Sequence, residues 1–103
     1  MTERFEHKQV NLAIQVLPSS ISKHPYDIVD EAIKIIAESG FKYRVTPFET
    51  VMEGPYGELM EVVKRVHETC YFHGAESMMC YLKIQSNGER EVTIEDKMAK
   101  YDN

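Results

Sequence analysis

The sequence has no apolar run near the roughly 20 residues that a membrane-spanning helix needs. Its first eight residues are charged and lack the apolar stretch of a signal peptide, so nothing in them indicates export. Cysteine is scarce, since Cys70 and Cys80 are too few for a disulfide scaffold and do not form a CxxC motif. Their neighbours are apolar or aromatic, so we expect two reduced core residues in a cytoplasmic protein.

Positive charge is also scarce, because 12 Lys and Arg residues face 17 Asp and Glu residues, giving a formal net charge of -5. Such a balance argues against binding DNA or RNA, whose phosphates are held by clustered Lys and Arg. It leaves a cationic small molecule open. The length of 103 residues, without linkers, repeats or low-complexity tracts, predicts a single domain with its core over about residues 9–86. Residues 1–8 and 99–103 are expected to be loosely held ends.

Four segments have the pattern of β-strands. In some of them every second residue is apolar, as with Val10, Leu12, Ile14 and Val16. Others are rich in residues that favour strands. Pro18 is expected to end the first strand and Pro47 to bend the chain between the second and third. The predicted strands are residues 9–17, 41–48, 49–53 and 76–86.

Apolar residues recur at helical spacing over residues 25–39 and 57–73. Pro25 suits a first helical position, and Gly40 suits a position just past a helix end. A short terminal helix is expected over about residues 93–101.

The resulting order is strand, helix, strand, strand, helix, strand. It predicts the α+β, ferredoxin-like βαββαβ plan, a four-stranded antiparallel sheet with two helices on one face, followed by the short C-terminal helix. None of these elements is assigned to the other face of the sheet, which carries Leu17, Met79 and Tyr81 beside polar residues. A mixed face of this kind favours a homo-oligomer formed through the sheet.

The end of the first strand and the hairpin bend can approach each other, because strands one and three are neighbours in this plan. Hydroxyl groups, carboxylates and an aromatic ring would then surround one space, which suits a flat, nitrogen-rich cation. Turn and strand chemistry explains the same residues without a ligand. The candidate ligand-binding residues are Ser19, Ser20, Phe48, Glu49, Thr50 and Glu53.

Several short motifs stand at a specific spacing: Pro18, Gly40-Phe41-Lys42-Tyr43, Thr46-Pro47, Thr50, Glu53-Gly54 and His67-Glu68. This spacing resembles that of the thiamine-binding-like family of small ferredoxin-like proteins. Two positions depart from the family pattern: Phe48-Glu49 replaces a usual Met-Gly, and Ser19-Ser20 replaces a frequent Gly-Thr.

This resemblance implies binding of thiamine, or of its hydroxymethylpyrimidine part, to sequester or sense it rather than to catalyse a reaction. It places the best site candidates at Ser19, Ser20, Thr50 and Glu53. Phe48 would either stack on a pyrimidine or fill part of the pocket, and an inward Glu49 would favour a thiazolium cation. The resemblance also implies dimers that pair into tetramers through their sheets.

Three other readings stay open. A dimeric ferredoxin-like enzyme would place Asn11, Gln15 or Arg44 in a cavity on the open sheet face, but no acid–base pair accompanies them. An RNA-recognition module would need aromatic residues on its central strands, and the first strand has none. A regulatory oligomer that binds another small ligand is compatible with the same sequence.

Catalytic residues, a cofactor and a metal site are not predicted. The serines lack a GxSxG elbow, no glycine loop suits a phosphate, and neither cysteine has an evident base partner. His67 and His73 lie six residues apart, which does not bring them to one helix face at metal-binding spacing. A packed or capping role for the histidines is the simpler interpretation.

Overall fold

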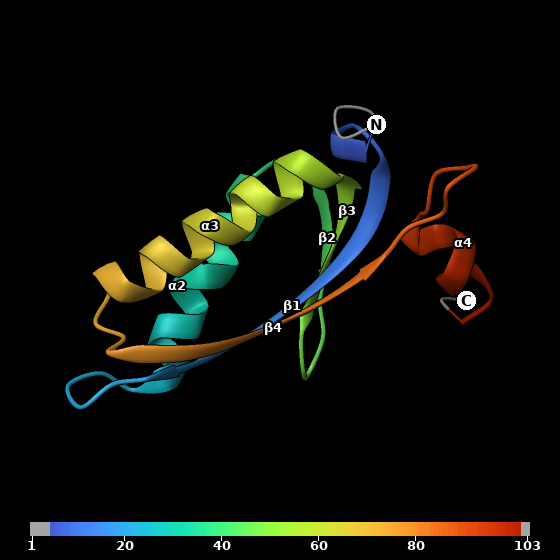
Figure 1. Cartoon of the computed structure of the whole chain (residues 1–103). Coiled ribbons are helices and arrows are strands. Elements are labelled where there is room, and N and C mark those ends of the chain that lie inside the picture. Colours follow the sequence, from blue (N-terminus) through green and yellow to red (C-terminus); the bar gives the residue numbers. More distant parts are fainter. Residues whose placement is uncertain (1–4, 102–103) are drawn as a thin grey trace.

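The computed structural model describes residues 5–101, and the termini predicted to be loosely held therefore lie partly outside the described residues. The chain forms a four-stranded antiparallel sheet with two long helices on one face (Figure 1). This is the predicted ferredoxin-like plan. The elements are β1 (Gln9–Ser19), α2 (Pro25–Glu38), β2 (Lys42–Val45), β3 (Thr50–Pro55), α3 (Tyr56–Phe72), β4 (Ser77–Gln85), α4 (Ile94–Met98) and the 3-10 helix η1 (Ala99–Tyr101).

The strand order is β2-β3-β1-β4, so β1 and β3 are the central strands. β1 pairs with β4 along nine positions, from Asn11 with Gln85 to Ser19 with Ser77. Its pairing with β3 is shorter and ends where Ile14 meets Thr50. The second half of β1 therefore has a strand neighbour on one side only (Figure 1).

The prediction that Pro18 ends the first strand is wrong, because β1 continues to Ser19. Pro18 pairs with Met78 in the half of β1 that β3 does not reach. A proline lacks the N–H that a central strand position needs, but it is tolerated where one edge of the strand is free.

The alternation along the strands fixes which face each side chain occupies. Val10, Leu12 and Ile14 of β1 point to the helices and are buried, together with Met52 of β3. The buried stripe of α2 packs on them, as does that of α3. These stripes are Ile28, Ala32 and Ile36 in α2, and Leu59, Val62, Val63, Val66 and Cys70 in α3.

Local signals explain where α2 begins and ends. His24 precedes it and accepts a hydrogen bond from the Tyr26 amide through Nδ1, at 3.2 Å, while Pro25 opens the first turn. At the other end Gly40 has a φ of 85°, in the left-handed region that glycine adopts without a steric penalty. The predicted end of this helix at Gly40 is thus confirmed.

The sheet face opposite α2 and α3, here called the open face, is partly covered by the C-terminal segment, contrary to the expectation that no element covers it. Three neighbouring strands hold this segment. The Asn11 side-chain amide donates to the Val92 carbonyl at 3.4 Å, a Glu53 carboxylate oxygen accepts from the Ile94 amide at 2.6 Å, and Lys97 Nζ donates to Gln85 Oε1 at 2.7 Å. Hydrophobic periodicity along the sequence cannot predict such contacts between distant positions.

Part of the predicted loose N-terminus is held against the start of α3. The rings of Phe5 and Tyr56 lie 4.7 Å apart, and the Tyr56 amide donates to the Lys8 carbonyl at 2.9 Å. The expectation for residues 5–8 is therefore wrong, because a ring contact and a backbone hydrogen bond fix them.

Candidate functional site

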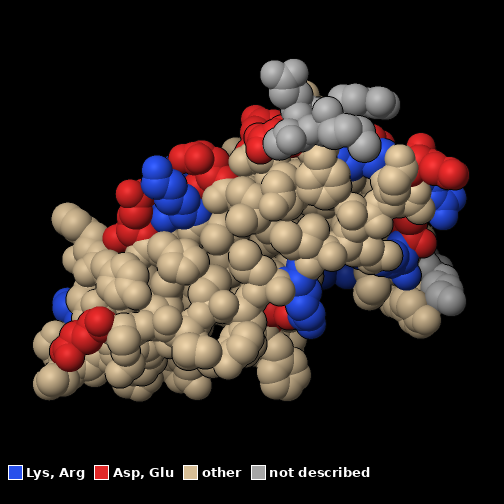
Figure 2. All heavy atoms as spheres, in the orientation of Figure 1, with Lys and Arg blue, Asp and Glu red and all other residues tan. Residues whose placement is uncertain are grey.

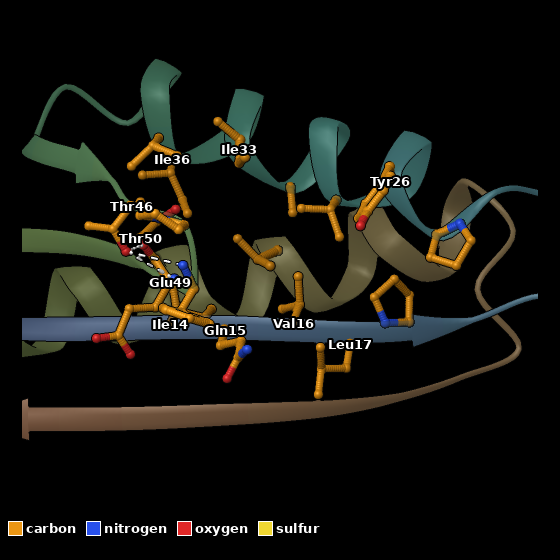
Figure 3. A pocket seen from close by; sticks show the side chains of 18 residues that line it. Ile14, Gln15, Val16, Leu17, Tyr26, Ile33, Ile36, Thr46, Glu49 and Thr50 are labelled. Carbon is orange, nitrogen blue, oxygen red and sulfur yellow. Dashed lines mark hydrogen bonds between the residues drawn. The ribbon is translucent and has the colours of Figure 1, made fainter.

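A cavity of about 270 Å³ lies between β1, α2 and the turn that joins β2 to β3 (Figure 3). We call it the helix-side cavity. Figure 3 shows α2 along one wall, β1 along the other and the labelled Thr46, Glu49 and Thr50 at one end. Its lining residues are Ile14, Gln15, Val16, Leu17, Pro18, Pro25, Tyr26, Val29, Ala32, Ile33, Ile36, Val45, Thr46, Pro47, Phe48, Glu49, Thr50 and Val66.

The short pairing of β1 with β3 explains why this space exists. β3 begins at Thr50, opposite Ile14. Beyond Ile14, β1 therefore has no strand beside it on that edge, under the first half of α2. Val29 and Ile33 of α2 consequently line a gap and are only partly buried. The fold itself leaves an apolar space at the edge of its core.

The polar end of the helix-side cavity is built by a tight turn. The Thr46 hydroxyl donates to the Glu49 carbonyl at 2.6 Å, and the Thr46 amide donates to the same carbonyl at 2.9 Å. The Glu49 amide in turn donates to Thr46 Oγ1 at 3.1 Å. These bonds fix the start of β3, so that Thr50, which is buried, reaches the cavity wall.

Two aromatic side chains stand at the edge of this cavity. Tyr26 from the first turn of α2 and Phe48 from the β2–β3 turn both line it and are largely exposed. Exposed aromatic rings beside an apolar space provide faces on which a flat ring can stack. The arrangement suits a planar ligand that also carries hydrogen-bonding groups.

Three of the six predicted site residues come together in the helix-side cavity: Phe48, Glu49 and Thr50. Ser19 and Ser20 lie near the other end of β1. The Ser19 carbonyl accepts from the Glu76 amide at 2.7 Å, and Ser20 Oγ accepts from the Lys23 amide at 3.2 Å. The structure does not bring these two serines to the cavity wall.

Glu53 lies on the open face, where its carboxylate accepts from the Ile94 amide at 2.6 Å. Thr50 and Glu53 are an odd number of residues apart on one strand, so their side chains point to opposite faces. Glu53 therefore holds the C-terminal segment in the structure, and it does not line the helix-side cavity.

A second cavity of about 290 Å³ lies on the open face and is called here the open-face cavity. It contains Asn11, whose side-chain oxygen is buried and has no hydrogen-bond partner among the described residues. Charged side chains from three elements surround it, as the blue and red groups in the hollowed underside of Figure 2 illustrate. Its lining residues are Asn11, Ala13, Glu49, Val51, Lys83, Ile84, Gln85 and Lys97.

Sequence reasoning missed Tyr26, Val29 and Ile33 as cavity residues. A signal for them exists, because the apolar stripe of α2 is wider than its buried core positions require. Val29 and Ile33 lie beside that core stripe, and Tyr26 is an aromatic residue on the first turn that the core does not use. A helix with such a widened stripe has more apolar surface than the core covers.

Two histidines and both cysteines have contacts or burial that indicate a structural role. His24 caps α2, and His67 Nδ1 lies 3.0 Å from the Val63 carbonyl one turn earlier. Burial raises the pKa of both the Cys70 and the Cys80 thiols, which disfavours the thiolate that a nucleophile needs. Among residues 5–101, no group of three or more His, Cys, Asp and Glu residues is arranged to hold a metal ion.

In the same described range, no helix is long and apolar enough to cross a membrane. The central strands β1 and β3 present no aromatic side chain on the open face in this range, which leaves the RNA-recognition reading without its required platform.

Comparison with known proteins identifies relatives over most of the chain. A UPF0045 protein of Clostridium perfringens is 37% identical over 91 residues, covering 88% of this chain and 95% of the relative. A domain of unknown function from Bacillus cereus has the same fold, with a TM-score of 0.90, 36% identity and coverage of 93% and 92% of the two chains. A Thermotoga maritima protein proposed to act in thiamine biosynthesis or salvage has a TM-score of 0.82 and 31% identity, with coverage of 90% and 98%. Residues 12–102 match the family described as thiamine-binding protein, and the chain therefore belongs to that family.

Proposed function

We propose that this protein binds thiamine, or its hydroxymethylpyrimidine part, in the helix-side cavity, and that it sequesters or senses this ligand without transforming it. The observation that carries the proposal is the cavity itself, in a chain that belongs to the thiamine-binding protein family. A space of about 270 Å³ is close to the smallest volumes usual for small-molecule sites. The proposed site residues in this cavity are Phe48, Glu49 and Thr50, joined by Tyr26.

Each part of the ligand has a matching group in this cavity. The aminopyrimidine ring is flat and carries both donors and acceptors, so it suits the faces of Tyr26 and Phe48 and the hydroxyl of Thr50. The thiazolium ring is a cation, and the acidic residue that lines this cavity is Glu49, whose carboxylate is paired with Lys83 at 3.0 Å. The apolar walls exclude water from both rings.

Ser19, Ser20 and Glu53 enter the proposal differently. The predicted topology and the resemblance both make them candidates, but none of them lines the helix-side cavity of one subunit. We propose them as contacts only for a ligand that extends beyond this cavity, toward the end of β1 or toward a second subunit.

The proposed functional unit is a homo-oligomer formed through the open face. Leu17, Met79 and Tyr81, here called the open-face apolar patch, are 48%, 57% and 50% exposed. They are neighbours, because Leu17 pairs with Met79 and Gln15 pairs with Tyr81. Figure 2 shows a largely uncharged surface at this end of the molecule. A contiguous apolar surface of this kind favours contact with a second copy of the chain.

The same proposal places the protein in the cytoplasm, where free thiols such as those of Cys70 and Cys80 persist in the reduced form.

An enzyme with its active site in the open-face cavity is the second reading. It finds less support, because Glu49 and Lys83 in that cavity neutralise each other at 3.0 Å and leave no free acid–base pair between them.

Titration calorimetry with thiamine and with hydroxymethylpyrimidine tests the proposal. We expect saturable heat with at least one of them and no change in the ligand recovered afterwards. No heat with either ligand at millimolar concentration would refute the thiamine assignment. Recovery of an altered ligand would favour the enzyme reading.

A further inference from the structure

Glu49 lies between the helix-side cavity and the open-face cavity, with its carboxylate on the side of β1 away from α2 (Figure 3). It lines both the helix-side cavity and the open-face cavity. One of its carboxylate oxygens is 3.0 Å from Lys83 Nζ, and its side chain is 24% exposed, against 72% for Lys83. Of the two members of this ion pair, the Glu49 side chain is thus the less exposed to solvent.

The sheet explains how Lys83 reaches this carboxylate. Lys83 is on β4 and Glu49 precedes β3, so β1 lies between them. The residue of β1 that pairs with Lys83 is Ala13, which also pairs with Val51 of β3. Because alanine has a short side chain, the long stem of Lys83 can pass over β1 at this position.

The ion pair controls the net charge beside the helix-side cavity. With both members present, their fields largely cancel at a ligand. With Lys83 removed, Glu49 loses its ion-pair partner and the net charge beside the cavity becomes more negative; with Glu49 removed, it becomes more positive. A charge a few ångströms from a ligand changes the binding of a cation but has little effect on a neutral molecule.

We propose that Lys83, by pairing with Glu49 across β1, determines whether the helix-side cavity prefers a cationic or a neutral ligand. This inference rests on the proposed function, since it concerns the choice between the thiamine cation and neutral hydroxymethylpyrimidine. Lys83 acts through Glu49 and is a specificity-determining residue, although it lines the other cavity.

The test compares the dissociation constants of both ligands, at a pH where the aminopyrimidine is neutral, for the full chain and three variants. Lys83→Met is expected to raise the preference for thiamine over hydroxymethylpyrimidine about 3- to 10-fold, and Glu49→Gln to lower it by a similar factor. The double variant Glu49→Gln/Lys83→Met is expected to return near the preference of the unmodified chain, because both charges are absent.

Lys97→Met is the matched control. Lys97 lines the same open-face cavity, but it donates to Gln85 Oε1 and makes no ion pair with Glu49. Its removal should leave the ligand preference within about twofold, since its charge is not directed at Glu49. Added salt should reduce the effect of Lys83→Met, because this lysine is exposed.

The outcomes separate the two proposals. If the unmodified chain binds neither ligand, the proposed function fails. If it binds both and the single variants leave the preference unchanged or move it in the same direction, the role of Lys83 is refuted while the proposed function stands. Thermal unfolding of each variant shows that it is folded, and Lys83→Gln provides a second neutral substitution with a polar end.

Discussion

Thr50 is the buried polar side chain of the helix-side cavity, and its position follows from local sequence. The turn from Thr46 to Glu49 sets the first residue of β3, and alternation along the strand then directs Thr50 toward α2. In the proposed complex its hydroxyl bonds a polar group of the ligand at the buried end of this cavity. Unpaired polar groups are costly in such a site.

Thr50→Val should therefore weaken binding of thiamine by about 1–3 kcal/mol, because valine keeps the shape but removes the hydroxyl. Titration calorimetry measures the change. Thr69→Val, on α3 and outside both cavities, is the matched control and should bind as the unmodified chain does. Unaltered affinity in Thr50→Val would move the site away from the helix-side cavity.

The residues of the candidate site were predictable to the extent that they are local in sequence. Phe48, Glu49 and Thr50 are consecutive, so the hairpin that positions one positions all three. Glu53 could have been assigned to the other face from the period of two along a strand. Tyr26 could not be placed with them from the pattern, because its approach depends on how α2 packs across the sheet.

The elements themselves were largely predictable from periodicity, and their ends were less so. The second strand is shorter than expected, Lys42–Val45 instead of residues 41–48, because the turn at Thr46 takes up its second half. The path of the C-terminal segment was not predictable. It is fixed by side chains from three strands, which are brought together only when the sheet has formed.

The end of α2 depends on the backbone conformation of Gly40. Its φ of 85° is unfavourable for any residue with a Cβ, whereas an added Cβ would meet nothing within 4 Å. Gly40→Ala should therefore lower the free energy of unfolding by about 1 kcal/mol through backbone strain alone.

Urea unfolding measures this loss, and Gly88→Ala is the control. An added Cβ at Gly88 also meets nothing within 4 Å, and this glycine does not have a positive φ, so its substitution should be close to neutral. Equal stabilities of the two variants would contradict the capping role of Gly40.

At the scale of the whole molecule, a short chain with a half-covered sheet points to assembly. The C-terminal segment covers one end of the open face, and the open-face apolar patch of Leu17, Met79 and Tyr81 remains at the other. The small core that 103 residues can build is commonly supplemented by contacts between subunits.

Met79→Lys should prevent the proposed assembly, because it places a charge in the centre of the apolar patch. Light scattering after size exclusion should find a dimer or tetramer for the unmodified chain and a 12.0 kDa monomer for the variant. Phe72→Lys changes an exposed apolar residue on α3 instead and should leave the oligomer intact. A monomeric unmodified chain would refute the proposed oligomer.

The most direct measurement of the central claim is a crystal structure of the protein grown with thiamine. The account predicts ligand density in the helix-side cavity, between α2 and β1, with the pyrimidine beside Thr50 and within reach of Phe48 and Tyr26. Density confined to the open-face cavity or to the region of Ser19 and Ser20, with the helix-side cavity empty, would contradict it.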